Sequence, residues 1–314
     1  MSRSLRIGTR GSALALWQAE EVSRLIKAMP GAPEVELVII KTRGDLQQDA
    51  PLWSTPGKGF FTAELDRAQL DNQVDVVVHS LKDLATVMSE GLSLTAVLER
   101  EDPRDALVAR KGGDLASLPQ EARIGTSSLR RRAFLAYARP DLKQLELRGN
   151  VPTRLRKLDD GEYDAVILAV AGLKRLGLEK RVSASLPTRS FPSAVAQGAI
   201  GVCTRTGDVE TMRWVEPLNH AATRVAADAE RGLLRRLEGG CQVPVGALAT
   251  VAGGIVTLYS AACNIDGSDF VSAEATAPLA EAVVLGVRVA EDLLSKGAWR
   301  VLAKANERRE AALQ

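Results

Sequence analysis

The sequence predicts an α/β protein with two doubly wound domains, followed by a small α+β domain that contains an antiparallel sheet. Apolar strand-like runs alternate with amphipathic helical stretches through most of the 314 residues, which is typical of sheets covered by helices on both faces. The runs VDVVV and AVILAV are largely apolar, as strands buried on both faces should be. Beyond about residue 220, Gly-Gly and Asp-Gly turns join short strands and indicate an antiparallel meander.

The first predicted domain covers residues 1–98 and begins with the strand LRIGTR and a helix over residues 12–28. The strand VELVIIKT, a helix over residues 60–70 and the strand VDVVVHS follow. Residues 43–59 form a connection far longer than the usual loop of about 4 to 6 residues, so we expect a structureless loop that acts as a lid. Its predicted lid residues are Arg43, Asp45 and Lys58.

The second predicted domain covers residues 99–193 and repeats the same alternation. Its strands are DALVARK, ARIGTSS, LKQLELRG and YDAVILAV, and its helices cover residues 128–138 and 152–158. The third predicted domain covers residues 218–314. It begins with a helix over residues 222–237, continues through a glycine-rich segment and the antiparallel strands, and closes with a helix over residues 279–296.

Composition excludes several classes of function. The chain carries 41 Lys and Arg against 39 Asp and Glu, and aromatic residues make up 4%, so we expect no nucleic-acid partner. No apolar run reaches the roughly 18 residues of a membrane span, and we expect no membrane partner. The three cysteines form no C-x-x-C pair, which favours a reducing, cytoplasmic location. Only two histidines are present, so a histidine-rich metal site is not expected.

Arginines gather where strands of the second domain pass into helices. The segment GTSSLRRR (125–132) places small hydroxyl residues and then three arginines at such a turn, where free N–H groups and the helix dipole favour an anion. The alternative is a capped helix with a solvated basic face. Arg148, Arg154 and Arg175 also follow strands or begin helices. Because ligands of open α/β sheets bind at the carboxyl ends of strands, these arginines indicate a ligand with several carboxylates or phosphates.

Two further segments carry residues suited to catalysis. Lys82 and Asp83 follow an apolar strand, where a carboxylate can stabilise a developing cation or move a proton; the alternative is a turn that solvates the strand end. Cys241 lies in EGGCQVPVG, whose glycines and proline favour an exposed turn and a reactive thiol. The alternative for Cys241 is burial as a small apolar residue. Neither a P-loop nor a dinucleotide glycine motif is present.

In order and spacing, a series of segments resembles the hydroxymethylbilane synthase family, also called porphobilinogen deaminases. The resemblance runs through nearly the whole chain, in TRGSALALWQA, TRGD, VHSLKD, EREDPRDA, GTSSLRRR, LRGNVPTRL, YDAVILAVAGLKRLG, AQGAIG and LEGGCQVPVG. It implies a monomeric three-domain transferase of porphyrin and other tetrapyrrole biosynthesis, heme included, with residues 194–217 returning to the first domain. It also implies a dipyrromethane cofactor, built from substrate and attached through a thioether, and the condensation of four porphobilinogen molecules to hydroxymethylbilane.

Carried onto this sequence, the resemblance implies a role for each matching residue. Cys241 is the expected attachment thiol, and Asp83 is the expected catalytic residue that helps to expel ammonia and balances the resulting cation. The expected cofactor-binding residues are Ser80, Lys82, Thr126, Ser127, Ser128, Arg130, Arg131, Arg148 and Arg154. The expected substrate-binding residues are Arg10, Ser12, Arg148, Arg175 and Gln197.

Three positions depart from the family pattern. Ala85 stands where a proline is usual, Ala196 replaces a glycine, and Ser54 occupies a loop position that often carries lysine. These changes leave every expected catalytic group in place and bear on turnover rate and stability, so a family member with impaired turnover is one alternative. A second alternative is a non-catalytic receptor for small anions, since two doubly wound, periplasmic-binding-protein-like domains with a crevice of arginines describe that class as well.

Overall fold

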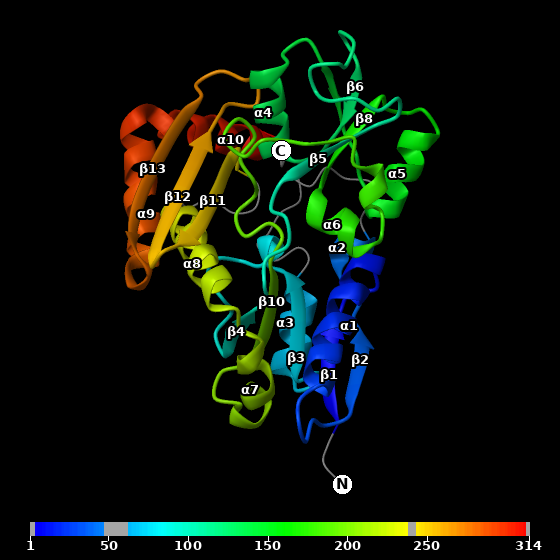
Figure 1. Cartoon of the computed structure of the whole chain (residues 1–314), viewed down its shortest axis with the longest axis vertical. Coiled ribbons are helices and arrows are strands. Elements are labelled where there is room, and N and C mark those ends of the chain that lie inside the picture. The colour runs from blue at the N-terminus through cyan, green and yellow to red at the C-terminus, as the bar shows by residue number, and fades with distance from the viewer. Residues whose placement is uncertain (1–3, 47–61, 238–242, 312–314) are drawn as a thin grey trace. The chain divides into compact units, whose positions relative to one another are not determined.

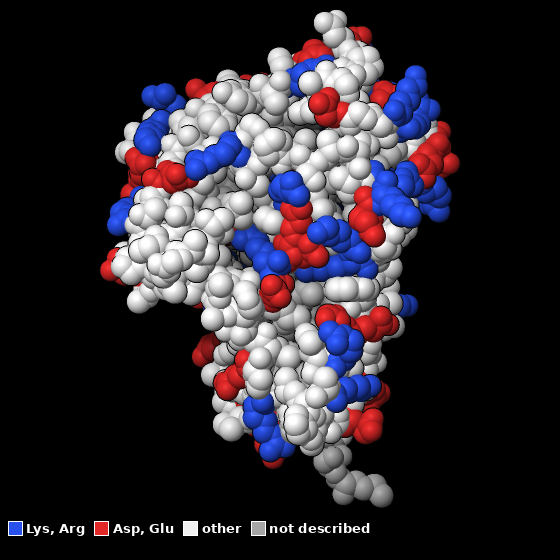
Figure 2. Space-filling model, viewed as in Figure 1, with Lys and Arg blue, Asp and Glu red and all other residues white. Residues whose placement is uncertain are grey.

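The computed structural model describes residues 4–46, 62–237 and 243–311, and it divides into two compact units (Figure 1). The first unit consists of the described residues up to Glu101 together with Ala199–Arg224, and the second consists of Asp102–Gly198 and the described residues from Val225 onward. Among the helices of these described ranges, none is long and apolar enough to cross a membrane. Acidic and basic side chains are interspersed over the face seen in Figure 2, in keeping with their nearly equal numbers.

The first unit is built on a five-stranded mixed sheet with helices on both faces. The strand order is β2 (Val35–Ile39), β1 (Leu5–Thr9), β3 (Val76–Ser80), β10 (Ile200–Arg205) and β4 (Leu92–Val97). β1 is parallel to β2 and β3, whereas β10 is antiparallel to β3 and β4. Helix α1 (Ala13–Lys27) packs against one face through the core that includes Ala19 and Val22, and α3 (Ala63–Leu70) packs against the other through Leu65.

Some elements of this unit differ from the sequence prediction. The predicted lid does not begin as a structureless loop, because Arg43–Leu46 form the short helix α2; the rest of that segment, with Ser54 and Lys58, lies outside the described residues. The pattern analysis assigned no strand to Leu92–Val97 or to Ile200–Arg205, and no helix to α7 (Val209–Val215). β10 is buried between β3 and β4, although it follows them by about one hundred residues in the chain, and no local signal reports such a pairing.

The second unit contains the other five-stranded sheet. Its strand order is β7 (Lys143–Leu145), β6 (Arg123–Gly125), β8 (Ala165–Ala169), β5 (Asp105–Ala109) and β9 (Ala184–Ser185). β6 is parallel to β7 and β8, and β5 is antiparallel to β8 and β9. The helices that follow strands β6, β7 and β8 are α4 (Leu129–Ala138), α5 (Val151–Asp159) and α6 (Val170–Arg175). The predicted strands and helices of this region are confirmed, with shorter strands.

The C-terminal part of the chain has the predicted antiparallel sheet, formed by β11 (Val245–Ala252), β12 (Ile255–Ala262) and β13 (Val271–Pro278), with α8 (Ala221–Arg236) preceding it. The single helix predicted over residues 279–296 is wrong at its end, because α9 (Ala282–Leu293) is followed by a π-helical turn and α10 (Trp299–Ala311). Gly297 has φ 103°, which breaks the regular helix there.

Phe134 and Phe191 share a core with Ala261 of β12, so the antiparallel sheet and the five-stranded sheet of the second unit pack together. The predicted three-domain division stays a prediction.

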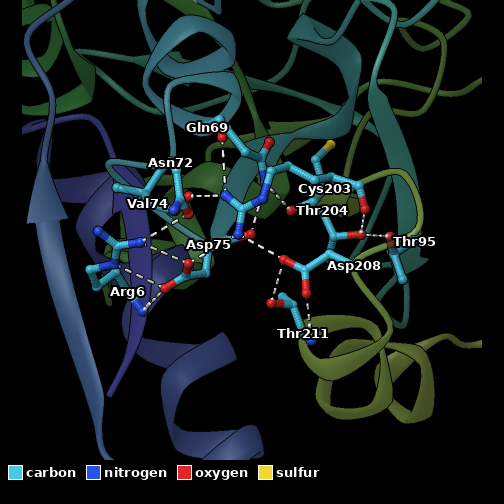
Figure 3. A network of polar contacts seen from close by, with 11 residues as sticks. Arg6, Gln69, Asn72, Val74, Asp75, Thr95, Cys203, Thr204, Asp208 and Thr211 are labelled. Carbon is cyan, nitrogen blue, oxygen red and sulfur yellow. Dashed lines mark hydrogen bonds and ion pairs between the residues drawn. The ribbon is translucent and has the colours of Figure 1, made fainter. Parts of the chain in front are cut away.

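A buried ion-pair network ties the first sheet together at the amino ends of its parallel strands (Figure 3). Asp75 is 4% exposed, and its carboxylate accepts hydrogen bonds from Arg6 at 2.9 and 3.0 Å and from Arg205 at 3.1 Å. Arg205 also donates to Asp208 at 2.7 Å. Burial opposes the charged form of Asp75, but the hydrogen bonds from Arg6 and Arg205 outweigh it and hold its pKa at about 2. The network therefore joins β1, β3 and β10, three strands from distant parts of the sequence.

We expect Asp75→Asn to lower the free energy of unfolding at neutral pH. The free energy of unfolding of the variant should also fall less than that of the wild type when the pH is lowered into the acid range. The folded-state pKa lies below the unfolded value of about 3.9, so the stabilisation is present above that value and is lost as the pH falls toward about 2. The difference in free energy of unfolding between wild type and variant should shrink by about 2 kcal/mol between about pH 6 and pH 2.5. Unfolding experiments at several pH values measure it. Asp71→Asn, at an exposed pair with Arg67, is the control and should show almost no such change. If the difference in free energy of unfolding stays constant with pH, Asp75 does not stabilise the fold through a lowered pKa.

Candidate active site

The first unit has a pocket of about 90 Å³ at the carboxyl ends of β1 and β3. This is the edge of an open α/β sheet where ligands bind. Four residues predicted from the sequence line it together, namely Arg10, Ser12, Ser80 and Asp83. The wall is completed by Leu14, Ala15, Gln18, Thr62, Val78 and His79.

One side of the pocket is the start of helix α1. Ser12 is its N-cap, and the Ser12 hydroxyl accepts a hydrogen bond from the Ala15 N–H at 3.3 Å. The helix runs for 15 residues, so its N-terminal end carries a partial positive charge toward the pocket. Arg10, half-buried, precedes this cap in the chain. The combination of a guanidinium and a helix N-terminus suits a carboxylate.

The other side of the pocket follows strand β3. Asp83 is half-buried in the 3-10 turn Leu81–Asp83, directly after the strand. The Gln18 amide donates to the Ser80 hydroxyl at 2.9 Å, which fixes α1 against the strand end. The pocket wall therefore contains both an acid and a positively polarised helix end, and it can bind a ligand that carries both charges. Lys82 is half-buried and is not part of this described wall.

The predicted lid residues are only partly described. Arg43 lies in α2, where its Nε donates to Glu64 Oε1 at 3.0 Å. Its side chain is 67% exposed, so this ion pair is a surface contact. Asp45 lies in the same short helix. Lys58 and the predicted attachment residue Cys241 lie outside the described residues.

In the second unit, two buried arginines surround one buried aspartate. Asp105, the first residue of β5, is fully buried, and Arg130 and Arg131 are 4% and 6% exposed. Arg130 Nη1 lies 2.7 Å from Asp105 Oδ2 and also donates to the Pro192 carbonyl. Arg131 donates to Asp105 Oδ1 from Nε at 3.0 Å and from Nη2 at 2.7 Å. We call these three residues the Asp105 cluster.

The Asp105 cluster carries one more positive charge than negative charge, since it contains two guanidinium groups and one carboxylate. Burial opposes the charged form of Asp105, but Arg130 and Arg131 outweigh it and hold the pKa of the carboxyl far below its usual range. Burial lowers the pKa of Arg130, and Asp105 opposes that effect. Gln197 Nε2 also donates to Asp105 Oδ1 at 3.0 Å and to the Pro103 carbonyl at 2.8 Å. A buried excess of positive charge favours a nearby anionic ligand.

The hydroxyl residues of GTSSLRRR have structural partners. Ser128 is the N-cap of α4 and accepts from the Arg131 N–H at 3.4 Å. The Ser127 hydroxyl donates to the Leu147 carbonyl at 2.9 Å, and the Thr126 hydroxyl accepts from the Ser128 N–H at 3.3 Å. The capped-helix alternative is thus correct for Ser128. It is wrong for the basic face, because Arg130 and Arg131 are buried rather than solvated.

The remaining predicted arginines lie in the same unit. Arg148 is half-buried, and burial lowers its pKa while Glu146 opposes the shift. Arg154 Nε donates to the Gly149 carbonyl at 2.8 Å, and Arg175 Nη2 donates to the Gly198 carbonyl at 2.6 Å. Arg154 and Arg175 are therefore anchored by the turns beside them, which fixes where their guanidinium groups lie.

The segment before Gln197 is held in an unusual conformation. Ala196 has φ 58°, in the left-handed region, as expected for a position where the family pattern has glycine. Its N–H donates to Glu230 Oε2 at 2.6 Å, and Glu230 Oε1 accepts from the Ala249 N–H at 2.8 Å. The fully buried Glu230 thus links Ala196 to β11 and keeps Gln197 beside Asp105.

The sequence analysis missed Asp105, Gln18, His79 and Glu230 as residues of these sites. Asp105 had one signal, since an acid that begins an apolar strand needs a buried cationic partner, and GTSSLRRR offered one. The pairing itself was not visible, because Asp105 and Arg131 are separated by 26 positions in the chain. Nothing in the helical pattern around Glu230 distinguished it from a surface acid.

Comparison with known proteins agrees with the resemblance in the sequence. Residues 5–213 match the family model described as porphobilinogen deaminase, dipyromethane cofactor binding domain, and residues 225–295 match the porphobilinogen deaminase C-terminal domain. The chain belongs to the porphobilinogen deaminase family. A porphobilinogen deaminase of Syntrophotalea carbinolica is 48% identical over 302 residues, which cover 96% of each chain.

Structure comparison also finds matches to periplasmic binding proteins at low sequence identity. The methionine-binding protein MetQ is 15% identical, with a TM-score of 0.45 over 68% of this chain and 89% of that chain. The Salmonella typhimurium arginine-specific periplasmic binding protein STM4351 is 13% identical, with a TM-score of 0.39 over 69% of this chain and 92% of that chain.

Membership of the porphobilinogen deaminase family confirms several predictions made from the sequence. The chain is a transferase of porphyrin biosynthesis that uses a dipyrromethane cofactor. Its fold is the predicted α/β architecture with an antiparallel C-terminal sheet. The roles of individual site residues, and the effect of Ala85, Ala196 and Ser54 on turnover, stay predictions.

We expect Asp105→Asn to destabilise this porphobilinogen deaminase strongly, because it leaves two guanidinium groups buried around a neutral amide. Breaking a buried ion pair from one side costs about 3 to 5 kcal/mol, and thermal unfolding should show a correspondingly large fall in melting temperature. The control is Asp159→Asn, which removes an exposed pair with Arg181 and should cost no more than about 1 kcal/mol. Equal losses in the two variants would mean that Asp105 does not hold the arginines.

Proposed function

We propose that this chain joins four porphobilinogen molecules head to tail on a dipyrromethane attached at Cys241. Hydrolysis then releases hydroxymethylbilane, and each condensation releases ammonia. The observation that carries the proposal is the pocket of the first unit, whose lining includes Asp83, Arg10 and the capped start of α1. Porphobilinogen has an acetate, a propionate and an aminomethyl group, so it presents both of the charges that this pocket can bind.

Asp83 is the proposed catalytic residue. When the aminomethyl C–N bond breaks, its electron pair leaves with ammonia and the remaining pyrrole becomes an azafulvenium cation. The Asp83 carboxylate stabilises that cation, because opposite charges attract more strongly in a half-buried site than in water. Its place directly after the rigid strand β3 keeps it fixed for each of the successive condensations.

The substrate carboxylates are proposed to bind on the opposite wall. Arg10 offers a guanidinium, and Ser12 begins the helix whose N-terminal end favours an anion. In the second unit, Arg148 and Arg175 are proposed to meet further substrate carboxylates. Gln197 supports this function through Asp105, to which its amide already donates.

The cofactor residues fit a polycarboxylate. The Asp105 cluster has one excess positive charge, and Arg148 lies half-buried in the same unit. The dipyrromethane supplies the pyrrole carbon to which the first substrate is joined. We propose that its acetate and propionate groups are held by Ser80, Lys82, Thr126, Ser127, Ser128, Arg130, Arg131, Arg148 and Arg154.

The choice of Cys241 as attachment point is supported by the state of the other two cysteines. Cys203 is 1% exposed in β10, which lies between β3 and β4, and Cys263 is fully buried. Burial raises the pKa of Cys263 to about 12, so its thiolate is scarce at neutral pH. Cys241 is the remaining thiol, and its glycine-flanked sequence favours exposure. A cytoplasmic monomer without nucleic-acid or membrane partners completes the proposal.

Intact-mass analysis of the denatured protein tests the proposed function. Wild-type protein supplied with porphobilinogen should carry a two-pyrrole adduct, and Cys241→Ser should carry none, because a thioether cannot form. Asp83→Asn should fold but lose nearly all condensation, whereas Asp71→Asn, at an exposed surface position, should behave as wild type. Normal turnover by Asp83→Asn, or an adduct on Cys241→Ser, would refute the roles assigned here.

A further inference from the structure

His79 is a buried histidine in the wall of the pocket that also contains Arg10, Ser12 and Asp83. It belongs to strand β3 and is 5% exposed. Its Nε2 has no hydrogen-bond partner among the residues that the structure describes. The mechanism above gives this side chain no role.

An unpartnered ring nitrogen at this position is costly for a purely structural residue. A buried polar group without a hydrogen bond loses its water contacts and gains nothing in return. The neighbouring positions of β3 carry no such unpartnered polar atom, since Val77 and Val78 are apolar and the Ser80 hydroxyl is hydrogen-bonded to Gln18 at 2.9 Å. A leucine of similar volume would fill the site of His79 without this penalty. An imidazole is therefore better explained here if a ligand that enters the pocket supplies a hydrogen-bond partner for Nε2.

The residues around His79 indicate which group of a ligand would be the hydrogen-bond partner of its Nε2. Burial and the positive charge of Arg10 lower the pKa of His79 to about 4, so the ring is neutral at neutral pH. A neutral imidazole with its proton on Nε2 is a hydrogen-bond donor without net charge. Arg10 lines the same pocket as His79, so the ligand group that meets both is the one that a guanidinium binds, a carboxylate.

We propose that His79 is a substrate-binding residue, whose Nε2–H donates a hydrogen bond to the porphobilinogen carboxylate held by Arg10. The proposal rests on the proposed function and adds a specificity residue to it. A neutral donor has an advantage over another cation here. Asp83 must favour a developing positive charge in the same pocket, and a further lysine or arginine would oppose that charge.

Steady-state kinetics of holoenzyme variants tests the role. His79→Leu removes the donor at similar volume, and we expect KM for porphobilinogen to rise about tenfold or more while kcat changes little. His79→Gln places an amide N–H near the position of Nε2 and should restore most of the affinity. The control is His220→Asn at the only other histidine, which is exposed, bonds Thr223 and lies outside the pocket wall. That variant should keep the wild-type KM.

A measurement on the wild-type holoenzyme covers the case in which His79→Leu does not fold. The probe is a porphobilinogen analogue with methyl in place of aminomethyl, which retains both carboxylates and cannot lose ammonia. In 15N-edited spectra of the two imidazoles, its binding should shift the His79 Nε2–H signal and slow its exchange with water, with His220 unchanged. Binding of the analogue without change at His79, or a wild-type KM for a folded His79→Leu holoenzyme, would overturn the proposal. Failure of the wild type to consume porphobilinogen would instead overturn the proposed function.

Discussion

The burial of two guanidinium groups around a single carboxylate is the constraint on which the second unit depends. Arg130 and Arg131 lie in the first turn of α4, and Asp105 begins β5, so this contact fixes a helix to a strand of the sheet. Buried ion pairs seldom add much net stability over a well-packed apolar core, because removing the charges from water costs about as much as their attraction returns. The excess of positive charge in this cluster instead agrees with the anion-binding role that we propose for it. The fold holds this excess positive charge desolvated and oriented, which suits the anionic ligand that we propose for it.

The first unit has a structural ion-pair network at one end of strand β3 and the charged residues of the candidate site at the other end. At the amino end of β3, Asp75 is saturated by Arg6 and Arg205, and this network joins three strands without reaching the pocket. At the carboxyl end, Asp83 faces a pocket lined by Arg10. A parallel arrangement of β1 and β3 produces this division directly, because their carboxyl ends meet at one edge of the sheet. The charges of the structural network are paired with one another, whereas Arg10 and Asp83 at the other edge line the pocket.

Local sequence patterns predicted those helices, strands and site residues that have a signal in neighbouring positions, and they missed those that depend on distant contacts. Helix α1 was predicted within one residue at each end, because Ser12 caps it and its apolar positions have helical spacing. β10 was missed, since its place between β3 and β4 depends on contacts with segments far away in the chain. The motifs identified the family and the residues Arg10 and Asp83, which the structure brings to one pocket. They did not reveal that Asp105, which lies in EREDPRDA, pairs with Arg130 and Arg131, because a buried partner for two arginines is selected by the fold and not by its neighbours in sequence.

The distribution of burial among the arginines bears on how one protein can serve a chain that lengthens during the reaction. Each added porphobilinogen brings two more carboxylates, so the compensating charge must grow with the product. In the Asp105 cluster, Arg131 donates hydrogen bonds to Asp105 and to the Ile167 carbonyl. Arg130 donates to the Pro192 carbonyl and forms an ion pair with Asp105, so both guanidinium groups are fixed in place. Arg10 and Arg148 are only half-buried, and a half-buried guanidinium can exchange water for a carboxylate with a small desolvation cost. The buried Arg130 and Arg131 thus suit the permanent cofactor that we propose they bind, and the half-buried Arg10 suits a substrate that arrives and moves on.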